Sequence, residues 1–227
     1  MEIRCLTFDL DNTLWAIEPV IRRAEKEFYA WLGEHCPGIT ARYEMGELAE
    51  QRHEYFKEFP QQRHNLTWLR KQWLTKIFSE FGYDHLDIES AFHYYWRYRN
   101  DVELFPGTHE TLGLLSQRYR IGVITNGNAS VEMIGINDYF DFVISAENIG
   151  VSKPAPEIFN AALQAAGIPA SQVVHIGDDP RIDILGASAM GFKTIWYNPK
   201  LSPWPGGQTP NAVVRTLAEL ESALDQM

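Results

Sequence analysis

The chain has 227 residues, of which 45% are hydrophobic and 22% charged, a composition typical of a globular protein rather than a disordered one. Its formal net charge of -10 argues against a general nucleic-acid or anionic-membrane surface, and no stretch approaches the apolar length of a membrane span. A small anionic substrate remains compatible with this charge, because a bound cation and a few basic groups can reverse the local field.

Only two cysteines are present, Cys5 and Cys36, and Cys5 falls inside an expected core strand. A structural disulfide is therefore not expected, and a reducing cytoplasm fits this cysteine usage. The first expected strand begins at residue 3, so no cleavable signal is expected before it. These features predict a cytoplasmic protein, and they contain no indication of its oligomeric state.

The first expected element is a buried strand over residues 3–8 with paired acids at its carboxyl end. Asp9, Asp11 and Thr13 follow at alternate positions, so their side chains can point to the same side. Two carboxylates this close repel each other unless a proton or a cation lies between them, and Mg²⁺ prefers oxygen ligands. Taken alone, Asp9 and Asp11 are also compatible with a solvated turn.

Residues 15–104 change to helical periodicity, which predicts four helices, one of them around residues 45–56. The apolar stripes at helical spacing are Ile21, Ala24, Phe28 and Leu32; Leu66, Leu69, Trp73, Ile77 and Phe81; and Ile88, Ala91, Phe92 and Tyr95. We expect these helices to form a compact bundle. Because the insertion directly follows the acidic loop, it can act as a lid over that loop.

From residue 105 onward helices and strands alternate, which predicts a parallel sheet built from βαβ units. The expected strands are 121–124, 142–145, 173–176 and 194–197, and the segment 199–210 is expected to be a loop. A capping box at Thr216 and Glu219 is expected to start a final helix that has Leu217, Leu220 and Leu224 on its inward face. We therefore expect one α/β domain of residues 1–14 and 105–227, interrupted by the helical insertion 15–104.

Polar side chains follow several of these strands. Besides the amino-terminal acids they are Thr125 with Asn126 and Gly127, Lys153 ahead of a helix, and Asp178, Asp179 and Asp183. Because the carboxyl ends of parallel strands meet at one edge of a sheet, we expect these groups to converge. Carboxylates bind Mg²⁺, while a lysine and backbone amides can hold phosphoryl oxygens, so the set predicts metal-assisted attack on a phosphate.

The order of these motifs resembles the haloacid dehalogenase-like hydrolase superfamily. The matching motifs are D-x-D-x-T at Asp9, Asp11 and Thr13, a hydrophobic strand ending at Thr125, a lysine before proline at Lys153, and G-D-x-x-x-x-D at Gly177, Asp178 and Asp183. The resemblance covers the whole α/β domain. It implies a Rossmann-like parallel sheet core with an inserted α-helical cap.

The resemblance also implies roles for the acidic residues. Asp9 would be the nucleophile that forms an aspartyl-phosphate, and Asp11 would protonate the leaving oxygen and then deprotonate the attacking water. Mg²⁺ would be held by Asp9, by the backbone carbonyl of Asp11 and by Asp178. Asp179 and Asp183 are expected to orient these groups without touching the metal.

The remaining motif residues would contact the substrate. Thr125 and Lys153 would bind the transferring phosphoryl group, and Lys153 would also offset the charge of Asp9. Thr13, Asn126 and Gly127 are assigned to substrate binding.

The subclass depends on Asp11, because a dehalogenase has no leaving alcohol to protonate and typically lacks this carboxylate. We therefore expect a Mg²⁺-dependent phosphatase of small phosphorylated metabolites, with no nucleic-acid or membrane partner. The cap entry at residues 18–23 and the segment 125–129 look most like bacterial phosphatases that act on 5-amino-6-(5-phosphoribitylamino)uracil in riboflavin synthesis. A sugar phosphomutase, a dehalogenase and a non-catalytic member of the same fold remain open alternatives.

Overall fold

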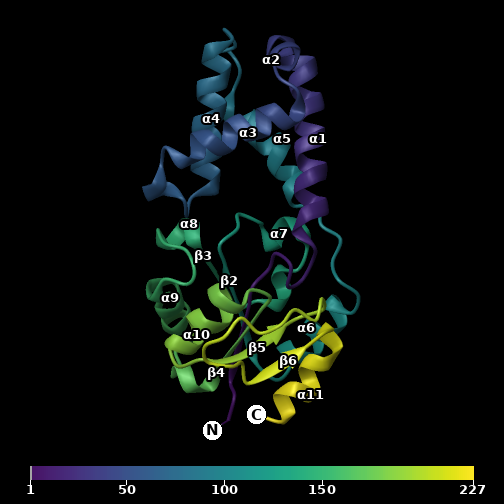
Figure 1. Ribbon diagram of the computed structural model, residues 1–227. Coiled ribbons are helices and arrows are strands. Elements are labelled where there is room, and N and C mark those ends of the chain that lie inside the picture. Colours follow the sequence, from purple (N-terminus) through teal and green to yellow (C-terminus); the bar gives the residue numbers. More distant parts are fainter. Residues whose placement is uncertain (1) are drawn as a thin grey trace.

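The computed structural model describes residues 2–227, which form a parallel sheet with helices on both faces and a helical bundle beyond one edge of the sheet (Figure 1). The strand order is β3-β2-β1-β4-β5-β6, and all neighbouring strands are parallel. The strands are β1 (Cys5–Phe8), β2 (Arg120–Thr125), β3 (Phe142–Ser145), β4 (Val173–Gly177), β5 (Lys193–Tyr197) and β6 (Ala212–Val214). The predicted α/β class, with a parallel sheet and an inserted helical cap, is confirmed.

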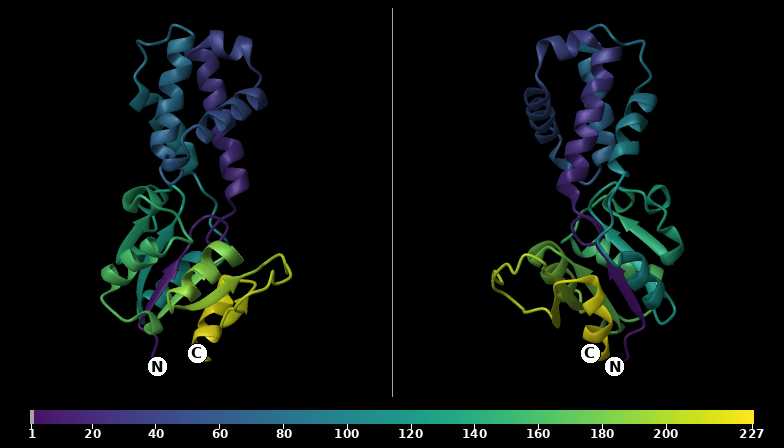
Figure 2. Two further views of the ribbon diagram at one scale, coloured as in Figure 1. Left: turned by 60° about the vertical axis from the view of Figure 1, so that its left-hand side comes forward. Right: turned by 90° about the vertical axis from the view of Figure 1, so that its right-hand side faces the viewer.

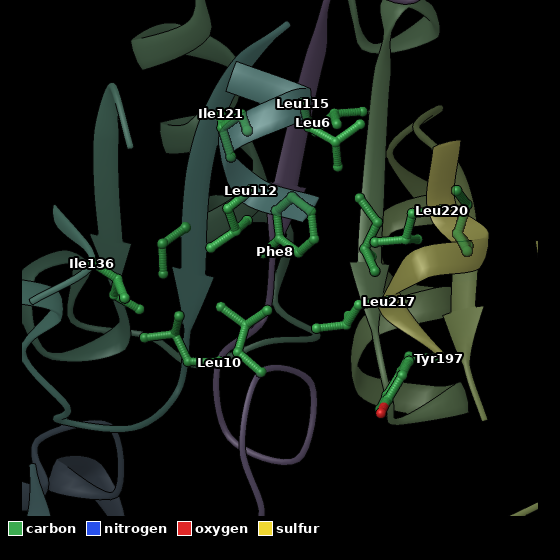
Figure 3. Packing of buried hydrophobic residues seen from close by; sticks show 14 of the residues in the cluster. Leu6, Phe8, Leu10, Leu112, Leu115, Ile121, Ile136, Tyr197, Leu217 and Leu220 are labelled. Atoms are coloured by element: carbon green, nitrogen blue, oxygen red, sulfur yellow. The ribbon is translucent and has the colours of Figure 1, made fainter. Parts of the chain in front are cut away.

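Strand β1 lies at the centre of the sheet between β2 and β4, and all four of its residues are buried. Its side chains alternate between the two faces, because successive residues of a strand point to opposite sides. Leu6 and Phe8 pack with Leu112 of helix α6 (Thr108–Ser116; Figure 3), whereas Cys5 packs with Phe159 of helix α9 (Pro156–Ala166). Because β1 is packed on both faces, the residues that follow it start from a fixed point at the carboxyl end of the central strand.

The helices around the sheet cover its two faces. They are α6 (Thr108–Ser116), α7 (Val131–Ile134), α8 (Ala146–Ile149), α9 (Pro156–Ala166), α10 (Gly186–Ala189) and α11 (Leu220–Asp225), with short helical turns at Asn137–Tyr139, Ala170–Gln172, Pro180–Leu185 and Leu217–Glu219. Leu217, Leu220 and Leu224 are buried as predicted.

The inserted segment forms a bundle with its own hydrophobic cluster, in which Phe28, Trp73 and Tyr95 are buried. Its helices are α1 (Ile17–His35), α2 (Pro37–Arg42), α3 (Met45–Lys57), α4 (Leu66–Glu80) and α5 (Ile88–Arg99), with a short turn at Pro60–Gln62. Both views of Figure 2 show this bundle beyond the carboxyl end of β1, on the side away from the two chain termini. Among residues 2–227, no helix has the length and apolar character needed to cross a bilayer.

The carboxyl-terminal segment differs from the prediction in two places. Strand β6 was not predicted, because three residues are too few to show an alternating pattern. The expected capping box also does not form: Glu219 accepts hydrogen bonds from the Thr216 hydroxyl (3.0 Å) and from Arg215 N (3.0 Å) instead of the Thr216 backbone N–H. The helix consequently begins as a tighter turn at Leu217–Glu219.

Candidate active site

The polar strand ends meet in a cavity of about 180 Å³ at the carboxyl edge of β1, β2 and β4. Its lining residues are Asp9, Asp11, Asn12, Thr125, Asn126, Gly127, Lys153, Asp178, Asp179, Ile182 and Asp183. Every residue that the sequence assigned to the site lines this cavity except Thr13. Residues far apart in the chain thus come together where the parallel strands end.

Asp9 follows β1 directly and continues its ladder, because its N–H donates to Ile176 O (2.9 Å). The residue is 8% exposed. Its Oδ1 accepts a hydrogen bond from Lys153 Nζ (2.6 Å), and its Oδ2 accepts one from the Thr13 hydroxyl (3.3 Å). Thr13 is fully buried, so in this arrangement its hydroxyl contacts Asp9 and does not reach a ligand in the cavity.

Lys153 lies between two carboxylates, because its Nζ also donates to Asp183 Oδ1 (2.7 Å). Asp183 in turn accepts from Asp179 N (3.0 Å) and lies 3.3 Å from His175 Nε2. The backbone of Lys153 is held by the Asn126 side chain, which accepts from Lys153 N (2.7 Å) and donates to Lys153 O (3.0 Å). The Asn126 amide group therefore positions the lysine.

The end of β2 forms the opposite wall of the cavity. Thr125 Oγ1 accepts a hydrogen bond from Gly127 N (3.0 Å), which leaves the hydroxyl proton of Thr125 available to a ligand. A Cβ atom at Gly127 would lie 2.6 Å from Asp11 Oδ2. Only glycine therefore fits at this position while Asp11 keeps its place.

The end of β4 adds Asp178, whose carboxylate joins those of Asp9 and Asp183 in a group with oxygen atoms within 4.8 Å of one another. A Cβ atom at Gly177 would lie 2.4 Å from Asp183 Cγ, so glycine at this position allows the chain to approach Asp183. Asp179 accepts two backbone N–H groups of the following turn and caps it.

The crowded acids shift each other's protonation. Burial raises the pKa of Asp9 to about 8, and the nearby Asp183 adds to this although Lys153 acts in the opposite direction. Burial and Asp183 raise the pKa of Asp178 to about 7. Burial disfavours the charged form of Lys153, but Asp183 and Asp9 outweigh it and raise the pKa of the lysine. One lysine therefore does not neutralise the three carboxylates, and a divalent cation with oxygen ligands fits the remaining charge.

The helical bundle contributes to the site through Arg99, in the last turn of α5. Arg99 Nη2 donates to both oxygens of Asp11 (2.9 and 2.6 Å), and Trp15 Nε1 donates to Asp11 Oδ1 (2.9 Å). Neither residue belongs to a sequence motif, and neither was predicted to lie in the site. Arg99 follows Tyr95 by four positions and Ala91 by eight, so it continues the apolar stripe of α5. A charged residue on an apolar stripe is the sequence signal that could have identified Arg99 as a site residue.

A larger cavity of about 490 Å³ adjoins the acidic one and shares Asn12, Asp178 and Asp179 with it. Its other lining residues are Ala16, Phe105, Pro180, Trp196, Tyr197, Asn198, Pro199, Lys200 and Ser202. Its volume lies within the range of about 300–1,000 Å³ that is common for small-molecule sites.

Comparisons with known proteins agree with this geometry. The profile of haloacid dehalogenase-like hydrolases matches residues 3–191. The 5-amino-6-(5-phospho-D-ribitylamino)uracil phosphatase YigB of Escherichia coli is 29% identical over 98% of this chain and 96% of its own. A glyceraldehyde 3-phosphate phosphatase of Pyrococcus abyssi is 29% identical over 86% of this chain and 81% of its own. The solved structure of a 2-haloacid dehalogenase from Pseudomonas syringae pv. Tomato DC3000 is 37% identical, with a TM-score of 0.92 and 99% of each chain covered.

Proposed function

Because the chain belongs to the haloacid dehalogenase-like hydrolase family, we propose that it is a Mg²⁺-dependent phosphatase of small phosphorylated metabolites. The observation that carries this proposal is the presence of Asp11 in the same cavity as Asp9 and Lys153. A phosphomonoester has a basic alkoxide as its leaving group, which needs a proton donor. The combination of a nucleophile, a cation for the phosphoryl group and a separate carboxyl group suits this reaction.

In the first step, a carboxylate oxygen of Asp9 bonds to phosphorus while the bond from phosphorus to the ester oxygen breaks. Asp11 gives its proton to the departing oxygen, so the product leaves as an alcohol. The Lys153 ammonium and the free hydroxyl proton of Thr125 face the cavity that holds the phosphoryl oxygens, where negative charge accumulates. The product of this step is an aspartyl-phosphate at Asp9.

In the second step, a water molecule attacks the phosphorus of the aspartyl-phosphate. The Asp11 carboxylate accepts a proton from this water, and the bond between phosphorus and the Asp9 oxygen breaks. Inorganic phosphate leaves, and Asp9 returns to its carboxylate form. Asp11 is protonated again and is ready for the next substrate.

The donor set of the site fits Mg²⁺, which would be held by the carboxylates of Asp9 and Asp178 and by the backbone carbonyl of Asp11. Asp183 is close to this group, but its oxygens already contact Lys153 and a backbone N–H. Without a cation, a pKa of about 8 keeps the Asp9 carboxyl protonated at neutral pH, a form that is not nucleophilic. When bound, Mg²⁺ supplies positive charge that favours the carboxylates and stabilises the phosphoryl oxygens.

As a specific substrate we propose 5-amino-6-(5-phosphoribitylamino)uracil. The similarity to YigB over almost the whole of both chains supports this choice. The adjoining cavity of about 490 Å³ has the volume to accept the rest of such a substrate.

We also propose that residues 15–104 form a cap separate from a core of residues 1–14 and 105–227. The separate hydrophobic cluster of the bundle supports this division. The two connecting segments lie side by side, because Trp15 and Leu104 form a β-bridge.

A cytoplasmic location stays a prediction. Both cysteines are free and buried, which fits a reducing compartment.

A dehalogenase is the second candidate function, because the structure at 37% identity is named a 2-haloacid dehalogenase. A halide leaves without protonation, so that reaction gives no role to Asp11. A sugar phosphomutase would use the same acid but would transfer the phosphoryl group between positions of a sugar and release little phosphate.

The test is product analysis with purified protein. We expect release of inorganic phosphate from p-nitrophenyl phosphate and from a panel of phosphorylated metabolites, abolished by EDTA and restored by Mg²⁺. Asp9→Asn should be folded and inactive. Chloride release from 2-chloropropionate without phosphate release would support the dehalogenase, and sugar phosphate isomers seen by phosphorus NMR would support the mutase. Equal activity of Asp9→Asn and the wild type would remove Asp9 from its role.

A further inference from the structure

Arg99 is the residue of the bundle that contacts the proposed proton donor. It is only 3% exposed, and its Nη2 binds both oxygens of Asp11. Its Nη1 is buried without a hydrogen-bond partner. A buried donor without a partner is unfavourable.

Helix α5 is anchored to the loop that follows β2 by residues on either side of Arg99 in the same turn. Trp96 Nε1 donates to Asn128 O (2.8 Å), and the Asn100 side chain accepts from Ser130 N (2.6 Å). These contacts determine where the guanidinium group of Arg99 lies. The place of the Asp11 carboxyl group therefore depends on how α5 contacts the loop that follows β2.

The Asp11 carboxyl group has a second donor, Trp15 Nε1, at 2.9 Å. Trp15 is fully buried in the segment that leads into α1, so it holds Asp11 from the other connection to the bundle. Asp11 lies beyond the end of β1, directly before Asn12 with its positive φ of 65°, and it is half-buried. Its orientation therefore depends on these two donors.

We propose that Arg99 is a positioning residue that aims the Asp11 carboxyl group at the leaving oxygen of the substrate. The inference rests on the proposed phosphatase function and assigns a role to a residue outside the family's sequence motifs. Arg99 acts through Asp11.

The test compares two substrates with the same ring and different leaving groups, p-nitrophenyl phosphate and p-nitrobenzyl phosphate. The p-nitrophenolate ion leaves without a proton, whereas the benzyl alkoxide needs one. We expect Arg99→Gln to lower kcat/KM on the order of tenfold or more for the benzyl ester and far less for the phenyl ester, because general-acid catalysis is worth about 10²–10⁴-fold. The parameter kcat/KM covers only the steps up to departure of the alcohol, so the later role of Asp11 as a base does not enter.

The ratio of the two kcat/KM values does not depend on the fraction of folded enzyme, so partial unfolding of the variant cancels. Trp15→Phe should change the ratio in the same direction, and Arg99→Lys should restore part of it. Arg97→Gln, two positions earlier on the exposed side of α5, is the matched control and should leave the ratio unchanged.

The possible failures are distinguishable. If the wild type hydrolyses neither ester with Mg²⁺, the proposed function fails. If the wild type hydrolyses both and Arg99→Gln lowers the two kcat/KM values equally, Arg99 is only structural and the inference is overturned while the proposed function stands.

Discussion

Lys153 Nζ lies 2.6 Å from Asp9 Oδ1, although 144 positions separate the two residues in the chain. Both side chains are almost completely buried. Burying an ionisable group is costly because it loses water, and such a contact is maintained only when further partners satisfy the groups. Asp183 on the lysine and Thr13 on the aspartate supply these partners. The pair therefore depends on the whole sheet edge being assembled.

Replacing the lysine should affect stability and activity together. Lys153→Met leaves the buried Asp183 carboxylate without its cation, and breaking a buried pair costs about 3–5 kcal/mol. We expect the free energy of unfolding in urea to fall by that amount at neutral pH, and phosphatase activity to fall on the order of 10²-fold or more. Lys26→Met on the exposed side of α1 is the control and should change neither. Normal stability of Lys153→Met would contradict the structural role of the pair.

The sequence predicted this meeting point because each polar residue follows a buried strand, and parallel strands end at one edge. That rule places Asp9, Thr125 and Asp178 without any knowledge of side-chain angles. Periodicity likewise predicted which leucines of the final helix are buried. These inferences rest on local patterns that tertiary contacts reinforce.

The contacts that the sequence did not predict depend on geometry between elements. Nothing local indicates that Thr13 points inward to Asp9, or that Asn126 holds the backbone of Lys153. The contact of Arg99 with Asp11 depends on how the bundle docks, which helical periodicity does not determine. Strand β6 forms because an edge of β5 is available to it.

Magnesium binding should strengthen as pH rises. In the metal-free protein the pKa values of about 8 for Asp9 and about 7 for Asp178 keep both groups largely protonated at pH 6. Mg²⁺ must displace these protons, so we expect its apparent affinity to increase by about 10- to 100-fold between pH 6 and pH 8, as measured by calorimetric titration.

The same shifts predict the stability of the metal-free protein. Both acids have raised pKa values in the folded state, so the folded protein binds more protons than the unfolded chain. Its free energy of unfolding should therefore fall as pH rises toward 8 unless Mg²⁺ is present.

Two variants serve as controls for the magnesium titration. Asp178→Asn should bind Mg²⁺ weakly at both pH values, whereas Asp225→Asn at the surface should behave like the wild type. Magnesium affinity independent of pH would contradict the protonation of these acids.

Gly127→Ala should reduce activity with little loss of stability. Its Cβ would lie 2.6 Å from Asp11 Oδ2 and 3.1 Å from Arg99 Nη2, so Asp11 must move. We expect kcat for alkyl phosphates to fall about tenfold or more, because a misplaced acid loses much of its contribution. Gly46→Ala in α3 is the matched control, because a Cβ atom there would have no neighbour within 4 Å, and it should keep full activity. Full activity of Gly127→Ala would show that Asp11 is not held as tightly as these distances indicate.

Phe78→Ala should unfold the bundle while leaving the sheet intact. Phe78 is fully buried in the bundle's own hydrophobic cluster, which also contains Phe28 and Trp73 and shares no residue with the clusters of the sheet. Removing a buried phenylalanine side chain costs about 3–5 kcal/mol, which a bundle of this size cannot readily absorb. Hydrogen exchange should then show loss of protection in residues 17–99 and retained protection in β1 and β4. Leu114→Ala on the exposed side of α6 is the control and should leave both regions protected. Simultaneous loss of protection in the bundle and the sheet would instead mean that the two parts unfold as one unit, and the proposed division into cap and core would be wrong.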